Sequence, residues 1–329
     1  MQTRQFLILL FICTFQSTFS QEKEIINEGS KMISVRNGKY QVWTKKVGDG
    51  NRKLLLLHGG PGTSPEYFFN FPEHLSDDYT IYYYAQLGAY LSDVPKDSTL
   101  YDLDSFVQDV EDVRKALNLD KFYLLGHSWG NYLAQAYSAK YQQHLKGIIL
   151  CNNINSDKEI VEDYEVQLYA DILDEFPEYK PYSDSLRFGF SGTFTDFGNR
   201  QSLGNKIREK VWPEMIKRHY ARLPNPLPEH LINSKTHSNG ALMQELGFTQ
   251  KIIDVDYNQF LIKIEKPVLF LGGKYDFIPP WYYVKMKNIL KKNIFSKVVI
   301  TNGGHFNMWD DPKNYFNAMD EFISILEKK

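Results

Sequence analysis

Uninterrupted runs of hydrophobic residues recur along the chain, and they predict strands that are buried on both faces. The runs occupy residues 53–58 (KLLLLH), 80–84 (TIYYY), 122–126 (FYLLG), 147–151 (GIILC), 267–273 (PVLFLGG) and 297–300 (KVVI). Between them, apolar residues recur at helical spacing over residues 103–117, and a closing helix is predicted from Asp311 and Pro312. This alternation predicts an α/β protein with a mostly parallel, doubly wound sheet. Before the first run, Asn37–Gly38 predicts a hairpin with a type I′ turn.

The alternation stops at about residue 156 and resumes at about residue 257. The stretch between is acidic, aromatic and helix-like, and prolines interrupt it. We therefore expect a helical cap domain at 156–256, inserted between two parts of one α/β core at 21–155 and 257–329.

Residues 1–20 have the features of a signal peptide. Arg4 gives the positive start, residues 6–15 form a short apolar core, and small residues follow. The apolar stretch is too short to span a bilayer, and we find no other candidate span. The sequence thus predicts an exported protein, periplasmic or, as the alternative, secreted.

Composition excludes several classes of function. The 329 residues carry a formal net charge of -2 and give no basic field that would hold nucleic acid. The cysteines, Cys13 and Cys151, cannot build a disulfide framework or a cysteine zinc site. We expect Cys151 to be a small buried core residue. Oligomeric state is left open.

A Gly-x-Ser-x-Gly motif at residues 126–130 (GHSWG) lies between a predicted strand and a predicted helix. Such a turn exposes the serine, so Ser128 is the candidate nucleophile, although a serine that merely caps the helix is the alternative. A serine nucleophile needs a base that an acid orients. His305 and Asp276 follow late strands in the expected chain order. His127 is expected to point away from the reaction, and Asp310 to cap a helix.

A glycine-rich segment at residues 58–62 (HGGPG) follows the strand at 53–58. Glycines there let backbone amides approach a developing oxyanion. We pair the amide of Gly60 with that of Trp129 as the predicted oxyanion hole. An ordinary glycine-rich strand exit is the alternative for this segment.

Together, HGGPG, GHSWG, GGKYD at 272–276 and GGHFNMW at 303–309 resemble the prolyl iminopeptidase family of serine α/β-hydrolases. The resemblance implies an α/β-hydrolase fold with a cap, and an aminopeptidase that releases an N-terminal residue, preferentially proline, from short peptides with a free N-terminus. It implies Ser128, Asp276 and His305 as the triad, and no metal or organic cofactor. It also implies that cap glutamates bind the substrate's α-amino group. Glu245 is the first candidate and Glu214 the second, although each could be a solvated helix residue.

One segment departs from the family pattern D-Q-x-G-x-G-x-S, because residues 85–92 read AQLGAYLS. Ala85 replaces the acid and Tyr90 the second glycine. The departure motivates an alternative, an exported serine esterase or amidase acting on small acyl substrates. A third hypothesis is a catalytically inactive hydrolase fold that serves as a binding protein. Epoxide hydrolases are disfavoured, because they use an aspartate where Ser128 stands.

Overall fold

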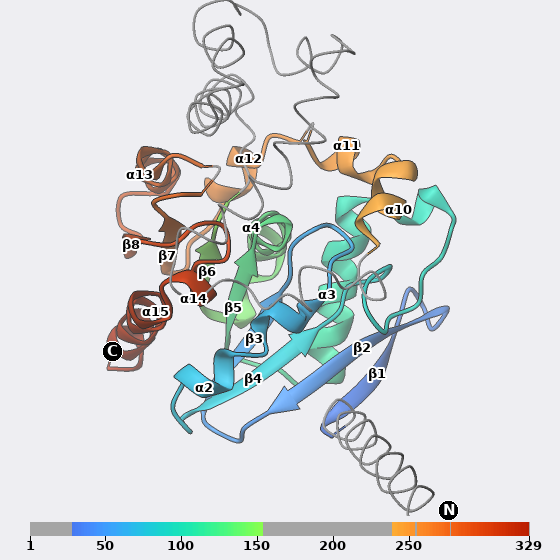
Figure 1. The fold of residues 1–329 in the computed structure, drawn as a ribbon, viewed down its shortest axis with the longest axis horizontal. Helices are drawn as coiled ribbons and strands as arrows, with labels where there is room; N and C mark the ends of the chain where they lie inside the picture. Colours follow the sequence, from blue (N-terminus) through green and yellow to red (C-terminus); the bar gives the residue numbers. More distant parts are fainter. Residues whose placement is uncertain (1–27, 154–238, 254, 277, 329) are drawn as a thin grey trace, which may run out of the picture.

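The computed structural model describes residues 28–153, 239–253, 255–276 and 278–328 (Figure 1). The predicted signal peptide and most of the predicted cap lie outside these residues. The described end of the cap, residues 239–253, contains two short helices.

The described residues form an eight-stranded sheet with the order β1-β2-β4-β3-β5-β6-β7-β8. β2 pairs antiparallel with β1 and β4, and every other pair is parallel. The predicted mostly parallel sheet is therefore confirmed. The strands are β1 Ser30–Val35, β2 Tyr40–Val47, β3 Arg52–Leu57, β4 Tyr79–Tyr84, β5 Phe122–His127, β6 Leu145–Cys151, β7 Val268–Gly273 and β8 Ser296–Thr301.

Helices cover both faces of the sheet (Figure 1). Successive strand residues enter opposite layers. In β3, for example, Leu55 and Leu57 pack in one hydrophobic cluster and Leu54 and Leu56 in the other. The first cluster includes α3, α4, α12 and α13, and the second includes α2, α14 and α15. The helices are α2 Phe71–His74, α3 Leu103–Ala116, α4 Trp129–Tyr141, α10 Gly240–Glu245, α11 Phe248–Ile253, α12 Asn258–Leu261, α13 Pro280–Ile289, α14 Asn307–Asp310 and α15 Pro312–Glu327, with 3₁₀ turns η1 Pro65–Phe68, η2 Ser98–Leu100 and η3 Gln142–His144.

The β1–β2 hairpin turns at Asn37 and Gly38, as the sequence predicts. Both residues have positive φ, 59° and 81°, and Lys39 N–H donates to the Arg36 carbonyl over 3.3 Å. Arg36 also has a positive φ of 54°, and its guanidinium makes two hydrogen bonds to the Asp109 carboxylate on α3. This ion pair joins the hairpin to the helical layer.

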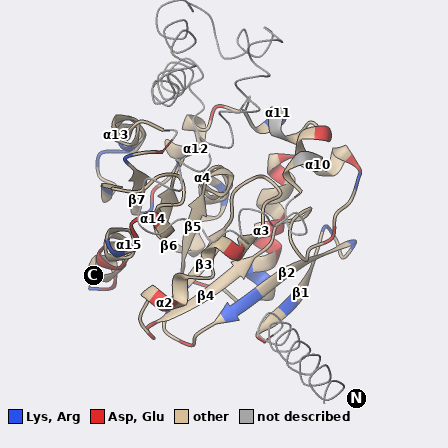
Figure 2. Ribbon diagram, in the orientation of Figure 1, with Lys and Arg blue, Asp and Glu red and all other residues tan. Residues whose placement is uncertain are grey.

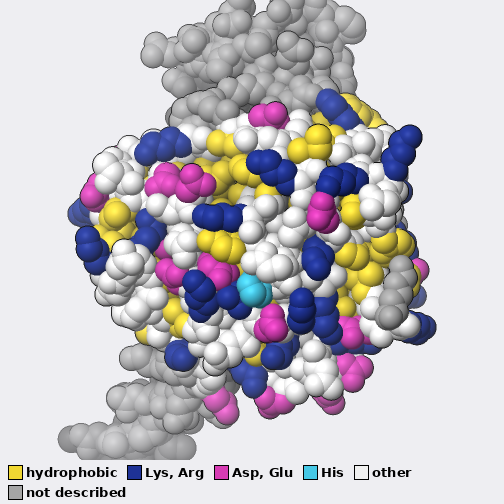
Figure 3. Space-filling model, turned by 180° about the vertical axis from the view of Figure 1, so that it is seen from behind, with side chains coloured by type: hydrophobic (Ala, Val, Ile, Leu, Met, Phe, Trp, Pro, Cys, Tyr) yellow, Lys and Arg dark blue, Asp and Glu magenta, His cyan; other side chains and the backbone are white. Residues whose placement is uncertain are grey.

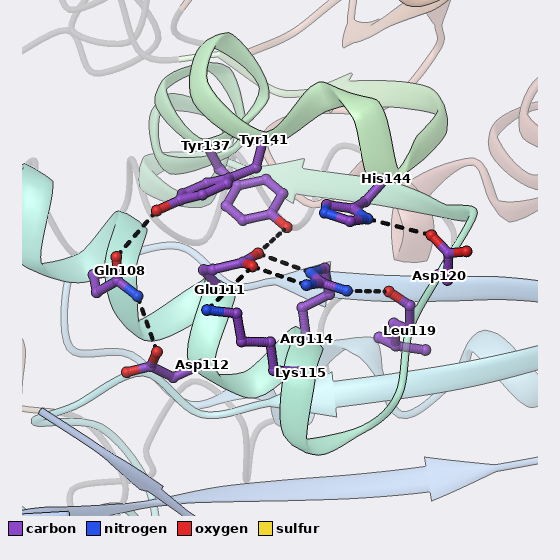
Figure 4. A network of polar contacts seen from close by, with 10 residues as sticks. All are labelled: Gln108, Glu111, Asp112, Arg114, Lys115, Leu119, Asp120, Tyr137, Tyr141 and His144. Atoms are coloured by element: carbon purple, nitrogen blue, oxygen red, sulfur yellow. Dashed lines mark hydrogen bonds and ion pairs between the residues drawn. The ribbon is translucent and has the colours of Figure 1, made fainter. Parts of the chain in front are cut away.

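A polar network joins α3 to α4 (Figure 4). Arg114 donates twice to the Glu111 carboxylate at 2.8 Å, and Tyr137 Oη donates to it at 3.0 Å. Burial alone would raise the pKa of Glu111, but the hydrogen bonds from Arg114 and Tyr137 lower it below its usual value. The buried carboxylate is thus compensated, and the two helices are held in register.

Few charged residues lie on the inner strands of the sheet. β4, β5 and β7 contain no Lys, Arg, Asp or Glu (Figure 2), and those of β3 and β6 are Arg52, Lys53 and Lys146. On the face shown in Figure 3, side chains of both signs are intermixed. Among the described residues, no helix has the length and hydropathy of a membrane span.

Candidate active site

Ser128 occupies a strained turn between β5 and α4. Its φ of 58° and ψ of −124° are sterically costly for a residue with a side chain. The glycines on either side allow the turn to close. A Cβ on Gly126 would lie 2.2 Å from the Gly130 carbonyl oxygen, and a Cβ on Gly130 would lie 2.0 Å from the Leu57 carbonyl oxygen. The structure therefore explains the motif as a steric requirement.

Ser128, His305 and Asp276 form a hydrogen-bonded row. Ser128 Oγ lies 3.0 Å from His305 Nε2, and His305 Nδ1 lies 2.8 Å from Asp276 Oδ1. The carboxylate can only accept, so Nδ1 carries the proton and Nε2 faces the serine hydroxyl as an acceptor. Asp276 is fully buried, whereas the His305 side chain is 13% exposed. The three residues come from the carboxyl ends of β5, β7 and β8.

Asn152, which no sequence motif singles out, holds the acid in place. It directly follows β6, has a φ of 43° and is completely buried. Its Nδ2 donates to Asp276 Oδ2 over 2.8 Å and to the Gly304 carbonyl over 2.9 Å. Both carboxylate oxygens of Asp276 are therefore bound. The only signal in the sequence was a polar residue at the end of a buried strand.

The segment Gly59–Gly60 lies directly against the nucleophile. A Cβ on Gly59 would approach Ser128 Cβ to 2.8 Å and Ser128 Oγ to 3.2 Å. Gly60 has a φ of +117°, and its bond to Pro61 is cis. Trp129 is the first residue of α4, where the backbone amide has no acceptor within the helix. The segments that carry both predicted oxyanion amides thus flank Ser128.

Gln86 connects these two segments. Its Nε2 donates to the His58 carbonyl over 2.8 Å, and its Oε1 accepts from the Trp129 indole over 2.7 Å. Its backbone amide donates to His58 Nε2 over 3.0 Å. Burial lowers the pKa of His58 to about 4, which keeps this ring nitrogen an acceptor. Gln86 belongs to the segment compared with the family pattern, but its own role was not predicted.

The two residues that depart from the family pattern pack into the core. Ala85 is completely buried in the hydrophobic cluster that includes α2, α14 and α15. Tyr90 has a φ of 52°, is 6% exposed and packs edge-on against Trp43 with ring centroids 4.9 Å apart.

Asp310 was predicted to cap a helix, and this prediction is wrong. It is the last residue of α14, is 3% exposed, and accepts a hydrogen bond from the Gly304 amide over 2.9 Å. It therefore supports the loop that carries His305. The reason is that Asp311 is the N-cap residue of α15, so Asp310 lies one residue before the cap, where its side chain is buried.

The structure places Glu245 at the exposed end of α10. Two residues earlier, the buried Met243 faces Gly62 and Gly88, so Glu245 lies about 200° around the helix from it. α10 itself docks on the glycine-rich segment, because the Asn239 amide donates to the Gly62 carbonyl over 2.7 Å. Glu214 lies outside the described residues.

Comparison with known proteins identifies the family. The model of the alpha/beta hydrolase fold matches residues 53–312. A proline iminopeptidase of Flavobacterium johnsoniae is 36% identical over 306 residues, covering 89% of this chain and 97% of the relative. One from Elizabethkingia meningoseptica is 34% identical over 312 residues, covering 90% and 98%. The chain belongs to the proline iminopeptidase family of α/β-hydrolases. The resemblance drawn from the sequence motifs is confirmed.

Solved structures of other proteins share the fold of this chain. The crystal structure of proline iminopeptidase from Mycobacterium smegmatis has a TM-score of 0.68 at 18% identity, covering 91% of this chain and 99% of that one. An esterase from Exiguobacterium antarcticum has a TM-score of 0.62 at 18% identity, covering 90% and 99%. The fold is thus shared by peptidases and esterases. The part of the chain that the structure describes holds no cluster of three or more potential metal ligands.

Proposed function

We propose that this chain is an exported proline iminopeptidase, a serine hydrolase that releases an N-terminal proline from short peptides. The row of hydrogen bonds from Ser128 through His305 to Asp276 supports serine hydrolase chemistry. The similarity to relatives named proline iminopeptidase supports the substrate class. The sequence features of a signal peptide in residues 1–20 support export, with the periplasm as the destination.

The geometry suits a two-step acyl transfer. Ser128 Oγ attacks the carbonyl carbon of the N-terminal residue while His305 Nε2, 3.0 Å away, takes the hydroxyl proton. Asp276 holds the other ring nitrogen and stabilises the imidazolium that forms. The amides of Gly60 and Trp129 donate to the oxyanion.

Collapse of the tetrahedral intermediate breaks the peptide bond, and His305 gives its proton to the leaving amine of the second residue. The first residue remains as an ester on Ser128. Water then attacks this ester with His305 again as base, and the free amino acid leaves. Every proton in this cycle passes through a single imidazole.

A substrate with a free α-amino group calls for a carboxylate near its ammonium. Glu245 and Glu214 are our candidates for this contact from the sequence. Each stays a prediction, because Glu245 is exposed on α10 and Glu214 lies outside the described residues.

The deciding experiment measures hydrolysis of proline anilide, alanine anilide and N-blocked proline anilide by the purified protein. We expect rapid release from free proline anilide, slower release from alanine anilide and none from the blocked compound. Ser128→Ala should abolish turnover of all three while leaving the thermal unfolding curve unchanged, and Glu245→Gln should raise KM for the free-amine substrates. Equal rates on blocked and free substrates, or turnover of simple esters alone, would support the esterase or amidase hypothesis instead.

A further inference from the structure

A chain of hydrogen bonds links Gly59 and Gly60, here called the oxyanion segment, to the backbone of the triad histidine. The Gly59 amide donates to Tyr67 Oη over 2.5 Å, and Tyr67 Oη lies 3.1 Å from His127 Nδ1. His127 Nε2 in turn lies 2.7 Å from the carbonyl oxygen of His305. Tyr67 and His127 are buried, with exposures of 6% and 1%. The chain thus joins two parts of the site that are far apart in sequence.

The direction of every proton in this chain follows from its last acceptor. A carbonyl oxygen can only accept, so His127 must carry its proton on Nε2. A neutral imidazole then has Nδ1 as an acceptor, and Tyr67 is the donor that faces it. The Tyr67 oxygen keeps a lone pair for the Gly59 amide. One arrangement therefore satisfies all the groups, and none of the three hydrogen bonds can reverse.

We infer that Tyr67 and His127 are positioning residues that hold the oxyanion segment and the triad histidine in one fixed relation. This inference rests on the proposed function of Ser128, His305 and Gly60. Fixing the Gly59 amide fixes the peptide that leads into Gly60. Fixing the His305 carbonyl fixes the backbone from which its ring reaches Ser128 Oγ, 3.0 Å away.

Aromatic packing makes this connection stiff. The Tyr67 ring packs edge-on against Phe306 with centroids 5.1 Å apart, and the His127 ring lies 4.9 Å from the His305 ring. The Trp309 indole donates to the Tyr67 carbonyl over 2.7 Å. Neither Tyr67 nor His127 can move without displacing the residues that follow His305. Burial also lowers the pKa of His127 to about 3, so the ring keeps its neutral form at working pH.

The test removes the Tyr67 hydroxyl and keeps its ring. Tyr67→Phe leaves the Gly59 amide and His127 Nδ1 without this partner. Because deletion of an oxyanion donor itself costs roughly 10²–10³ in kcat, we expect loss of its support to lower kcat on the order of tenfold with KM nearly unchanged. Tyr315→Phe is the matched control. It removes the hydroxyl of another buried tyrosine, which contacts Cys151 Sγ at 3.3 Å, and it should leave kcat within about twofold.

Variants of His127 test whether the two residues act as one unit. His127→Gln can still donate to the His305 carbonyl and should retain more activity than His127→Leu. In a double-mutant cycle, Tyr67→Phe should lower kcat less once His127 is leucine, because Tyr67 Oη then keeps only its contact with the Gly59 amide. Thermal unfolding of each variant separates a loss of folded protein from a loss of rate.

The labelling rate of Ser128 by a fluorophosphonate probe gives a readout that does not depend on the peptide substrate. It should fall in Tyr67→Phe on the order of tenfold and not in Tyr315→Phe. Equal labelling of the two variants, or additive losses in the cycle, would overturn the inference. A wild-type protein that labels rapidly but does not cleave proline anilide would contradict the proposed function alone.

Discussion

The surroundings of the buried Asp310 carboxyl group disfavour its charged form. Burial and the negative charge of Asp276 together raise its pKa to about 7, against the hydrogen bond from the Gly304 amide. Oδ1 of Asp310 has no hydrogen-bond partner. In the unfolded chain the same carboxyl has its ordinary pKa of about 3.8. Between these values the folded state binds a proton that the unfolded state does not.

Stability should therefore depend on pH through this residue. Because the folded pKa of this acid is raised, its contribution favours folding at low pH and is lost as pH rises toward about 7. Asp310→Asn keeps an oxygen for the Gly304 amide and removes the titration. We expect its unfolding free energy, relative to wild type, to rise on the order of 2–3 kcal/mol between pH 5 and pH 8.

Urea unfolding at several pH values measures this difference, with the exposed Asp77→Asn as a control for the loss of one charge. If the difference in unfolding free energy between Asp310→Asn and wild type stayed constant with pH, the carboxyl would titrate normally in the folded state.

At the scale of elements, the first turn of α4 sits on the end of β3. A Cβ on Gly130 would meet the Leu57 carbonyl oxygen at 2.0 Å and the His58 carbonyl oxygen at 2.7 Å. Both are backbone atoms of a central strand and its exit, so no side-chain movement can relieve the contact. The helix would have to move away from the sheet, together with the Trp129 amide.

We expect Gly130→Ala to lower the unfolding free energy by more than about 2 kcal/mol and to abolish most of the turnover. Gly147→Ala in β6 is the matched control. Its Cβ would meet Leu326 Cδ1 at 2.9 Å and Phe322 Cε1 at 3.2 Å, which are ends of side chains. It should cost less than about 1 kcal/mol and keep activity. Equal losses in the two variants, by urea unfolding and anilide hydrolysis, would contradict this account.

The predictable part of the fold and site is the part encoded by local pattern. The β5 strand, the turn at Ser128 and the order of Asp276 and His305 follow from short motifs and from strand ends. Asn152 and Tyr67 could not be found in this way. Asn152 reaches Asp276 across 124 positions of sequence, and Tyr67 reaches His127 across 60. Neither residue stands in a motif, and their roles exist only where separate strand ends meet.

The hairpin shows what a local signal can and cannot reach. Asn37 and Gly38 predict the turn by their own backbone preferences, and they are its central residues, with φ of 59° and 81°. The bond from Arg36 to Asp109, 73 positions away, could not be predicted in this way. The amine-binding glutamates were drawn from the family resemblance. The role of Glu245 in binding the substrate's amino group stays a prediction, because none of the contacts described above tests it.

At the scale of the whole molecule, the Arg36–Asp109 pair ties the antiparallel edge of the sheet to the helical layer. The two side chains are 11% and 0% exposed, and the third Arg36 nitrogen, Nη1, donates to the Leu100 carbonyl over 3.0 Å. Burial raises the pKa of Asp109 to about 6, although the hydrogen bonds and charge of Arg36 oppose this shift. The carboxylate is therefore charged at neutral pH only because the guanidinium is present.

Removing one partner should cost much more than removing both. Arg36→Met leaves a buried carboxylate without its cation, and we expect a loss of about 3–5 kcal/mol at pH 8. The pKa of Asp109 then rises further above 6, so protonation relieves the variant and the loss should shrink at pH 5. The double variant Arg36→Met/Asp109→Leu should recover most of the stability at pH 8, because no buried charge remains.

Urea unfolding at both pH values measures the cycle, with Lys291→Met, from an exposed pair with Glu265, as a control that should change little. A double variant as unstable as Arg36→Met at pH 8 would mean that packing of the two side chains, rather than their charges, joins the hairpin to α3.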